Sequence, residues 1–227
     1  MSNVVTTRAN SAGQWVAGAA AVFIAAWIVG LVVAIGGPGI NDSATHIASY
    51  YVDHRRASML GTYLIDGVAG AALIVFSSGL SGTLRRIETG EQTLSRIAVA
   101  AGTAAGAVSF VQAAFGIVLA NHVAAAGEPI ATRALFELLN TADTFKMLGL
   151  ALLVGATTVL AFAVRAFPAW VGWIGAATVL ALVVGGVGFV TNSSGLYAVL
   201  FGGLPLLLIW VASVGVLSMR GTPSAAG

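Results

Sequence analysis

The chain contains no cysteine and very few charged residues. Only 8% of its 227 residues are charged, whereas a typical soluble domain carries about 25%. The absence of cysteine excludes disulfides, thiol nucleophiles and cysteine-ligated metals. Hydrophobic residues make up 58% of the chain, which is the composition of an integral membrane protein. The net charge of +2 comes from a few basic residues and gives no support for nucleic-acid binding.

Six apolar runs are each long enough to cross a bilayer, which takes about 20 residues of helix. We therefore predict an all-α membrane bundle of six helices, forming a single domain at 15–219. A cytoplasmic tail is expected at 1–14 and a disordered tail at 220–227. The expected spans are about 15–36, 57–84, 97–120, 143–165, 168–190 and 196–219.

Basic residues are distributed unevenly between the predicted loops. The N-terminal tail, the loop 85–96, Arg165 and Arg220 together hold six of the ten basic residues and two of the eight acidic ones. Short cytoplasmic loops are enriched in Lys and Arg. We therefore expect both termini in the cytoplasm and the longer polar segments, with all three histidines, on the outer side.

The turn after Arg165 carries a recognisable pattern. Residues 167–173 are Phe-Pro-Ala-Trp-Val-Gly-Trp. From Asp143 to Val190 the chain resembles small multi-pass bacterial membrane proteins of the domain of unknown function 4386 type. The resemblance implies a bacterial plasma membrane and assigns no catalytic or binding residue. Pro-x-Trp is also what the membrane interface favours at a helix start.

Two ionisable residues lie inside predicted spans at matching depth. Asp66 and Arg85 are 19 residues apart, as are Lys146 and Arg165, so both charges should lie about 28 Å from the inner arginines. Gln112, sixteen residues beyond Arg96, should reach about 24 Å. One interpretation is an outward-facing polar cavity that binds a ligand; its candidate residues are Asp66, Gln112, Lys146, Tyr63 and Glu137. The other is a structural ion pair that joins spans two and four.

The outer polar segments hold possible metal ligands. His46 and His54 share a helical face with Tyr50, beside Asp53. With His122, these residue types suit zinc or another divalent ion, but hydrogen-bonded loop residues are the alternative. No cofactor is expected.

Two further patterns concern packing. Gly102 and Gly106 have the GxxxG spacing, which fits either packing within the chain or a homo-oligomer contact. The segment 132–140 is amphipathic, and we expect a short helix at the membrane interface, which could continue into span four.

No stretch of the sequence specifies a reaction, so three classes of function are considered. The first is binding or movement of a small amphiphile or lipid headgroup at the outer cavity. The second is an intramembrane enzyme that acts on a lipid or isoprenoid, with Asp66 or Glu137 as acid or base and a histidine as partner. The third is a structural subunit of a membrane complex. Only a pair of ionisable residues converges by counting, which favours binding over catalysis.

Overall fold

The computed structural model describes residues 2–219, with side chains from residue 12 onward, and this part of the chain is helical without strands. Six helical segments in it are long and apolar enough to cross a membrane, which confirms the predicted six-helix all-α bundle. η1 and η2 are π-helices, and η3 is a 3₁₀ turn. The elements are α1 (Ser2–Val33), α2 (Ala44–Asp53), α3 (Arg55–Thr62), η1 (Tyr63–Val68), α4 (Ala69–Leu84), α5 (Thr93–Val118), η2 (Leu119–Val123), η3 (Ala124–Ala126), α6 (Pro129–Ala163), α7 (Ala169–Thr191) and α8 (Ser194–Met219).

The helices continue beyond the apolar runs that predicted them. α1 begins at Ser2 and so includes most of the segment expected as a tail, and α6 begins at Pro129. Hydropathy marks only the part of a helix that suits hydrocarbon, whereas a helix can continue into the polar layer where its polar face is solvated. The tail predicted at 220–227 lies outside the described residues.

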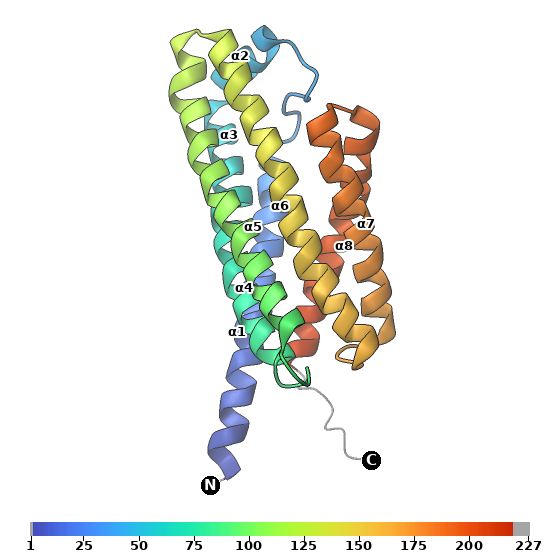
Figure 1. The fold of residues 1–227 in the computed structure, drawn as a ribbon. Coiled ribbons are helices and arrows are strands. Elements are labelled where there is room, and N and C mark those ends of the chain that lie inside the picture. Colours follow the sequence, from blue (N-terminus) through green and yellow to red (C-terminus); the bar gives the residue numbers. More distant parts are fainter. Residues whose placement is uncertain (1, 220–227) are drawn as a thin grey trace.

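The long helices pack in a ring, in which α1, α4, α5, α6, α7 and α8 each contact the next and α8 returns to α1. Figure 1 shows α7 and α8 together on one side, and α1, α4 and α5 on the other, with α6 between them. Among the six spans, α6 has the largest share of buried residues. Inside the ring, Phe76 of α4 meets Trp210 of α8 edge-on, with ring centroids 6.3 Å apart.

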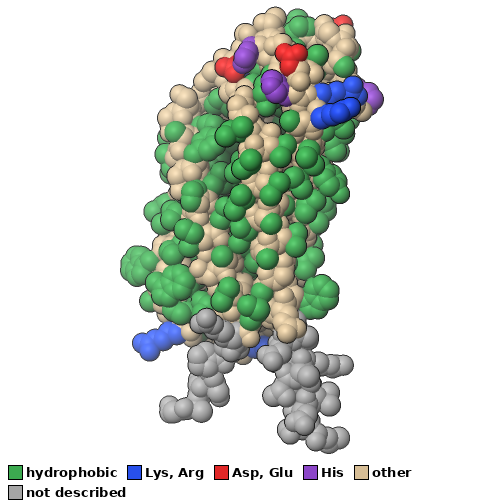
Figure 2. Space-filling model, turned by 180° about the vertical axis from the view of Figure 1, so that it is seen from behind, with side chains coloured by type: hydrophobic (Ala, Val, Ile, Leu, Met, Phe, Trp, Pro, Cys, Tyr) green, Lys and Arg blue, Asp and Glu red, His purple; other side chains and the backbone are tan. Residues whose placement is uncertain are grey.

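Both ends of the described chain lie at one end of the bundle. Gly13 of α1 packs directly against the backbone of Ser218 in α8. The exposed side chains of Trp15, Trp170 and Trp173 belong to the same end, because α6 finishes and α7 starts there. Figure 2 shows hydrophobic side chains along the flank and charged side chains at the two ends. This distribution suits a bundle embedded in a bilayer.

The GxxxG face of α5 packs against α4 of the same chain. A Cβ atom at Gly106 would lie 2.8 Å from the carbonyl oxygen of Gly70, and one at Gly102 would overlap Ser77. Both glycines are buried against α4. The interpretation of this face as a contact between two copies is therefore wrong, because its small residues already bring α5 close to α4.

The amphipathic segment 132–140 does not lie flat at the interface but forms part of the continuous helix α6. Its apolar residue Phe136 packs with Ile47 of α2 and Leu119 of η2. Arg133 donates hydrogen bonds to the carbonyl oxygens of Ile40 and Asp42 in the loop before α2. Because α2 and η2 cover Phe136, this segment does not need a lipid surface to bury that side chain, and it can continue the direction of α6.

A carboxylate holds the turn between α4 and α5 at the other end. Glu88 accepts hydrogen bonds from the backbone N–H groups of Leu94 and Ser95, both at 2.8 Å, and from the Ser95 hydroxyl. Slight burial would raise the pKa of Glu88, but these hydrogen bonds and the charge of Arg96 outweigh it, so the pKa is lowered. Glu88 thus caps the free N–H groups of the first turn of α5.

Candidate functional site

The predicted pair of Asp66 and Lys146 is present and belongs to a network of three charges. The Nζ atom of Lys146 lies 2.8 Å from Oδ1 of Asp66 and 2.6 Å from Oδ1 of Asp143. The side chains of Lys146, Asp66 and Asp143 are 6%, 15% and 23% exposed. The network joins the span that contains η1 to α6, as the equal spacing of Asp66 from Arg85 and of Lys146 from Arg165 predicted.

Asp143 is the member that sequence reasoning missed. It lies at the start of the predicted fourth span, where the polar segment meets the apolar run. Its spacing of three residues from Lys146 was the available signal, because residues i and i+3 of a helix are neighbours. With Asp143 included, two carboxylates share one ammonium group.

A local change of helix type surrounds Asp66. η1 is a π-helix, closed by a hydrogen bond from the N–H group of Ala69 to the carbonyl oxygen of Leu64. Single π-turns within α-helices are frequent at functional sites, and they change which residues share a face. Here one short segment directs Asp66 to α6 and presents Tyr63, Gly67 and Val68 to a groove on another face.

Gln112 lies at the expected depth in the bundle, and its side chain is hydrogen-bonded to the backbone of α6. Its Nε2 atom donates to the carbonyl oxygen of Leu139 at 3.0 Å, one turn before Asp143. Its side-chain oxygen is buried and has no hydrogen-bond partner among the described residues. The packing of Thr62 on Gly116 and of Ser109 on Gly70 places Gln112 at the depth of Asp66.

The five residues predicted to share one polar cavity are therefore divided between different surroundings. Glu137 is exposed and pairs with Arg133 at 2.5 Å. Tyr63 is 54% exposed and lines the groove. The structure therefore does not bring these five residues together in one polar cavity. Lys146 itself fills the space between Asp66 and Asp143.

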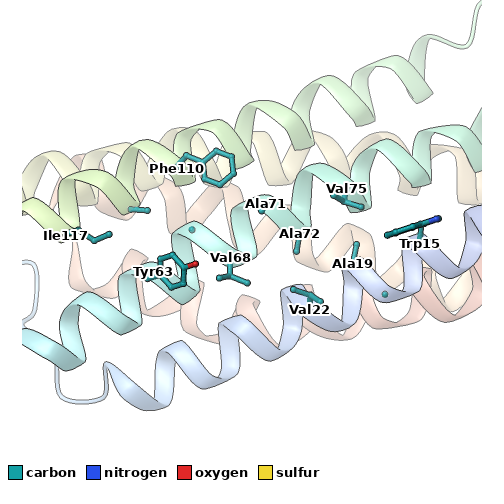
Figure 3. A pocket seen from close by; sticks show the side chains of 13 residues that line it. Trp15, Ala19, Val22, Tyr63, Val68, Ala71, Ala72, Val75, Phe110 and Ile117 are labelled. Atoms are coloured by element: carbon teal, nitrogen blue, oxygen red, sulfur yellow. The ribbon is translucent and has the colours of Figure 1, made fainter.

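The groove runs along the bundle between α1, η1, α4 and α5 and has a volume of about 800 Å³. Small residues form its floor, among them Gly18, Gly67 and Ala71. Figure 3 shows Trp15 towards one end and Tyr63 and Ile117 towards the other. The complete lining is Trp15, Gly18, Ala19, Val22, Tyr63, Gly67, Val68, Ala71, Ala72, Val75, Phe110, Ala113 and Ile117. Its chemistry suits a hydrocarbon chain.

A smaller pocket of about 100 Å³, called the polar pocket below, lies between α6 and the end of α7, at the end of the bundle away from the two termini. Glu137, Asn140 and Thr141 contribute polar groups from α6, and Asn192 contributes from the turn after α7. Asn140 precedes Asp143 by three residues and so shares its face of α6. The pocket thus lies directly outside the charged network.

Tyr51 of α2 is a neighbour of the network. Burial raises the pKa of its phenol, and Tyr50 and the negative charge of Asp66 raise it further. Tyr51 also packs edge-on against Phe136, with ring centroids 6.4 Å apart. It is therefore a neutral phenol close to Asp66.

The candidate metal ligands do not converge. His46 lies 3.6 Å from Asp42, and the ring of His54 stacks on Tyr50 with centroids 4.5 Å apart. His122 contacts the side-chain amide of Asn121. Among the side chains that the structure describes, no three His, Asp or Glu residues are placed to hold a metal ion. The geometric support for a site of His46, Asp53, His54 and His122 is thereby removed.

Comparison of the chain with family models, with curated proteins and with solved structures found no match. The resemblance of residues 143–190 to bacterial membrane proteins stays a prediction. The groove and the charged network are therefore the two features of the structure that bear on function.

Proposed function

We propose that this membrane protein binds a lipid-like amphiphile and holds its hydrocarbon chain in the groove between α1, α4 and α5. The groove itself is the observation that supports the proposal. Its volume of about 800 Å³ is within the range of roughly 300–1,000 Å³ that small-molecule sites occupy. Its lining is almost wholly apolar, with the hydroxyl group of Tyr63 as a polar contact.

The size of the groove favours a single chain over a helix of another protein. Residues 63 to 75 of the span line it, which corresponds to about 18 Å along a helix. A transmembrane helix of a partner would need a surface about 30 Å long. The width comes from Gly18 and Gly67, at which an added side chain would meet open space or only ordinary contacts.

We further propose that the end bearing Arg85, Arg96 and Arg165 faces the cytoplasm of a bacterial cell. Its excess of basic residues supports this orientation. It would place the charged network in the outer half of the bundle. Reporter fusions at the N-terminus and after Arg220 should both give cytoplasmic signals, and a periplasmic signal from either would reverse the orientation.

Filling the groove tests the binding proposal. Gly18 is exposed to the groove, and nothing lies within 4 Å of an added Cβ atom. Gly202 of α8 is equally open but lies outside the groove. Gly18→Leu should therefore reduce the amount of lipid retained through mild purification, measured by native mass spectrometry, whereas Gly202→Leu should not.

The outcome that would contradict the proposal is equal lipid retention by the two variants and the unchanged protein. Tyr63→Phe adds information about the ligand. A ligand whose polar group reaches the Tyr63 hydroxyl should bind more weakly to this variant, with its hydrocarbon chain still retained.

A further inference from the structure

The charged network has more negative than positive groups. When all three groups are ionised, Asp66 and Asp143 carry two negative charges and Lys146 carries one positive charge. Among the described side chains, no arginine and no other lysine forms an ion pair with either acid. An uncompensated charge in a buried site is unfavourable because low-polarity surroundings replace water. Binding of one proton would remove it.

The groups around the network do not supply the missing charge. Tyr51 of α2 is within electrostatic range of Asp66, and Tyr197 of α8 is within range of Asp143. Both are phenols and are neutral near pH 7. From α5, Gln112 contributes an amide, and from α7 the carbonyl oxygen of Gly186 is already bonded to Thr144.

The polar pocket lies close to the network and has room for water. Its volume of about 100 Å³ is enough for about three water molecules. Asn140 lines it and lies one turn from Asp143 on the same face of α6. Asp143 is also the more exposed of the two acids, at 23% against 15% for Asp66.

We propose that Asp66, Lys146 and Asp143 form a proton-binding site that is reached from the polar pocket, in which the two carboxylates take up one proton between them. One carboxylate becomes a neutral carboxylic acid, and the other remains with Lys146 as a balanced ion pair. A metal ion is a poorer occupant, because Nζ of Lys146 already occupies the position between the two carboxylates.

The test is the pH dependence of the unfolding equilibrium, measured by isothermal denaturation in detergent at constant ionic strength. A folded state that binds one proton more than the unfolded state loses stability as the pH rises, by about tenfold in the equilibrium constant per pH unit. Asp66→Asn and Asp143→Asn each remove the excess negative charge, so this dependence should disappear from both variants.

Asp53→Asn is the matched control, because Asp53 is an exposed acid at the same end of the molecule and outside the network. It should retain the pH dependence of the unchanged protein. The proposal is overturned if either Asp66→Asn or Asp143→Asn retains it too, or if sodium ions replace protons in stabilising the unchanged protein.

Infrared spectroscopy provides a test that does not depend on a folded variant. The unchanged protein should develop the carbonyl band of one additional neutral carboxylic acid as the pH is lowered, before the exposed acids titrate. Titration of all carboxylates together near their ordinary pKa values would contradict a proton site in the network.

Discussion

Two seams of the bundle, the contact between α7 and α8 and the groove between α1, η1, α4 and α5, contain glycines that act in opposite ways. In the first seam, Gly185 and Gly188 of α7 allow the backbone of α8 to approach, and a Cβ at Gly188 would lie 2.5 Å from the backbone nitrogen of Tyr197. In the second, Gly18 and Gly67 face no such neighbour and leave the groove open. Glycine thus allows close contact in the seam between α7 and α8 and leaves the seam along the groove open.

This difference shows that the effect of a small residue depends on whether another helix packs against it. In a membrane, helices associate through close packing and interhelical hydrogen bonds, because lipid tails are as apolar as the side chains. Where a second helix reaches the glycine, the space is filled by protein. Where none does, as in the groove, the space stays open, and our proposal is that a hydrocarbon chain fills it.

The largest effect is expected from the charged network that joins η1 to α6. Lys146→Met leaves Asp66 and Asp143 buried without their cation, and should lower the free energy of unfolding by about 3 kcal/mol. Asp66→Asn should cost less, since Asp143 still neutralises Lys146. Both single variants and the double variant, measured by isothermal denaturation, give the coupling energy. Effects that add would show that the ion pair contributes nothing to the link.

Gly188→Ala should destabilise the protein by disrupting the close contact between α7 and α8. The clash with the backbone of Tyr197 cannot be relieved by rotating a side chain, and overpacking of this kind costs about 1–3 kcal/mol. Gly18→Ala, in the groove, should be neutral or slightly stabilising because alanine favours helix. Thermal unfolding of the two variants compares them directly, and equal destabilisation would remove the distinction between the two seams.

A smaller effect is expected where α4 turns into α5. Loss of the cap in Glu88→Gln should cost about 1 kcal/mol. Because the folded-state pKa of Glu88 is lowered, its contribution is complete above the ordinary glutamate pKa and is lost as the pH falls through the folded value. The unchanged protein and the variant should therefore converge in stability at acid pH. A constant difference at all pH values would contradict this account of the cap.

Sequence patterns were sufficient for the spans and for one long-range contact. Long apolar runs locate helices because each must cover a fixed thickness of hydrocarbon. Equal spacing from Arg85 and Arg165 placed Asp66 beside Lys146, because helical rise converts residue count into depth. Asp143 was not recognised as a partner because it lies at the edge of an apolar run.

The groove and the upright start of α6 depend on contacts between distant segments. Nothing in the sequence near Tyr63 marks a π-helix, so the change of face at Asp66 could not be predicted. The segment 132–140 has the pattern of an interfacial helix, but α2 and η2 cover its apolar residue Phe136. Amphipathicity identifies the apolar face of a helix without identifying what will cover it.

The most direct test of the groove as a lipid site is a structure of the protein in a lipid bilayer. The account predicts a continuous hydrocarbon-like density between Trp15 and Tyr63, better ordered than the surrounding lipid and absent from Gly18→Leu. A groove closed by movement of α1 onto α5, or density no better ordered there than around α7 and α8, would contradict it.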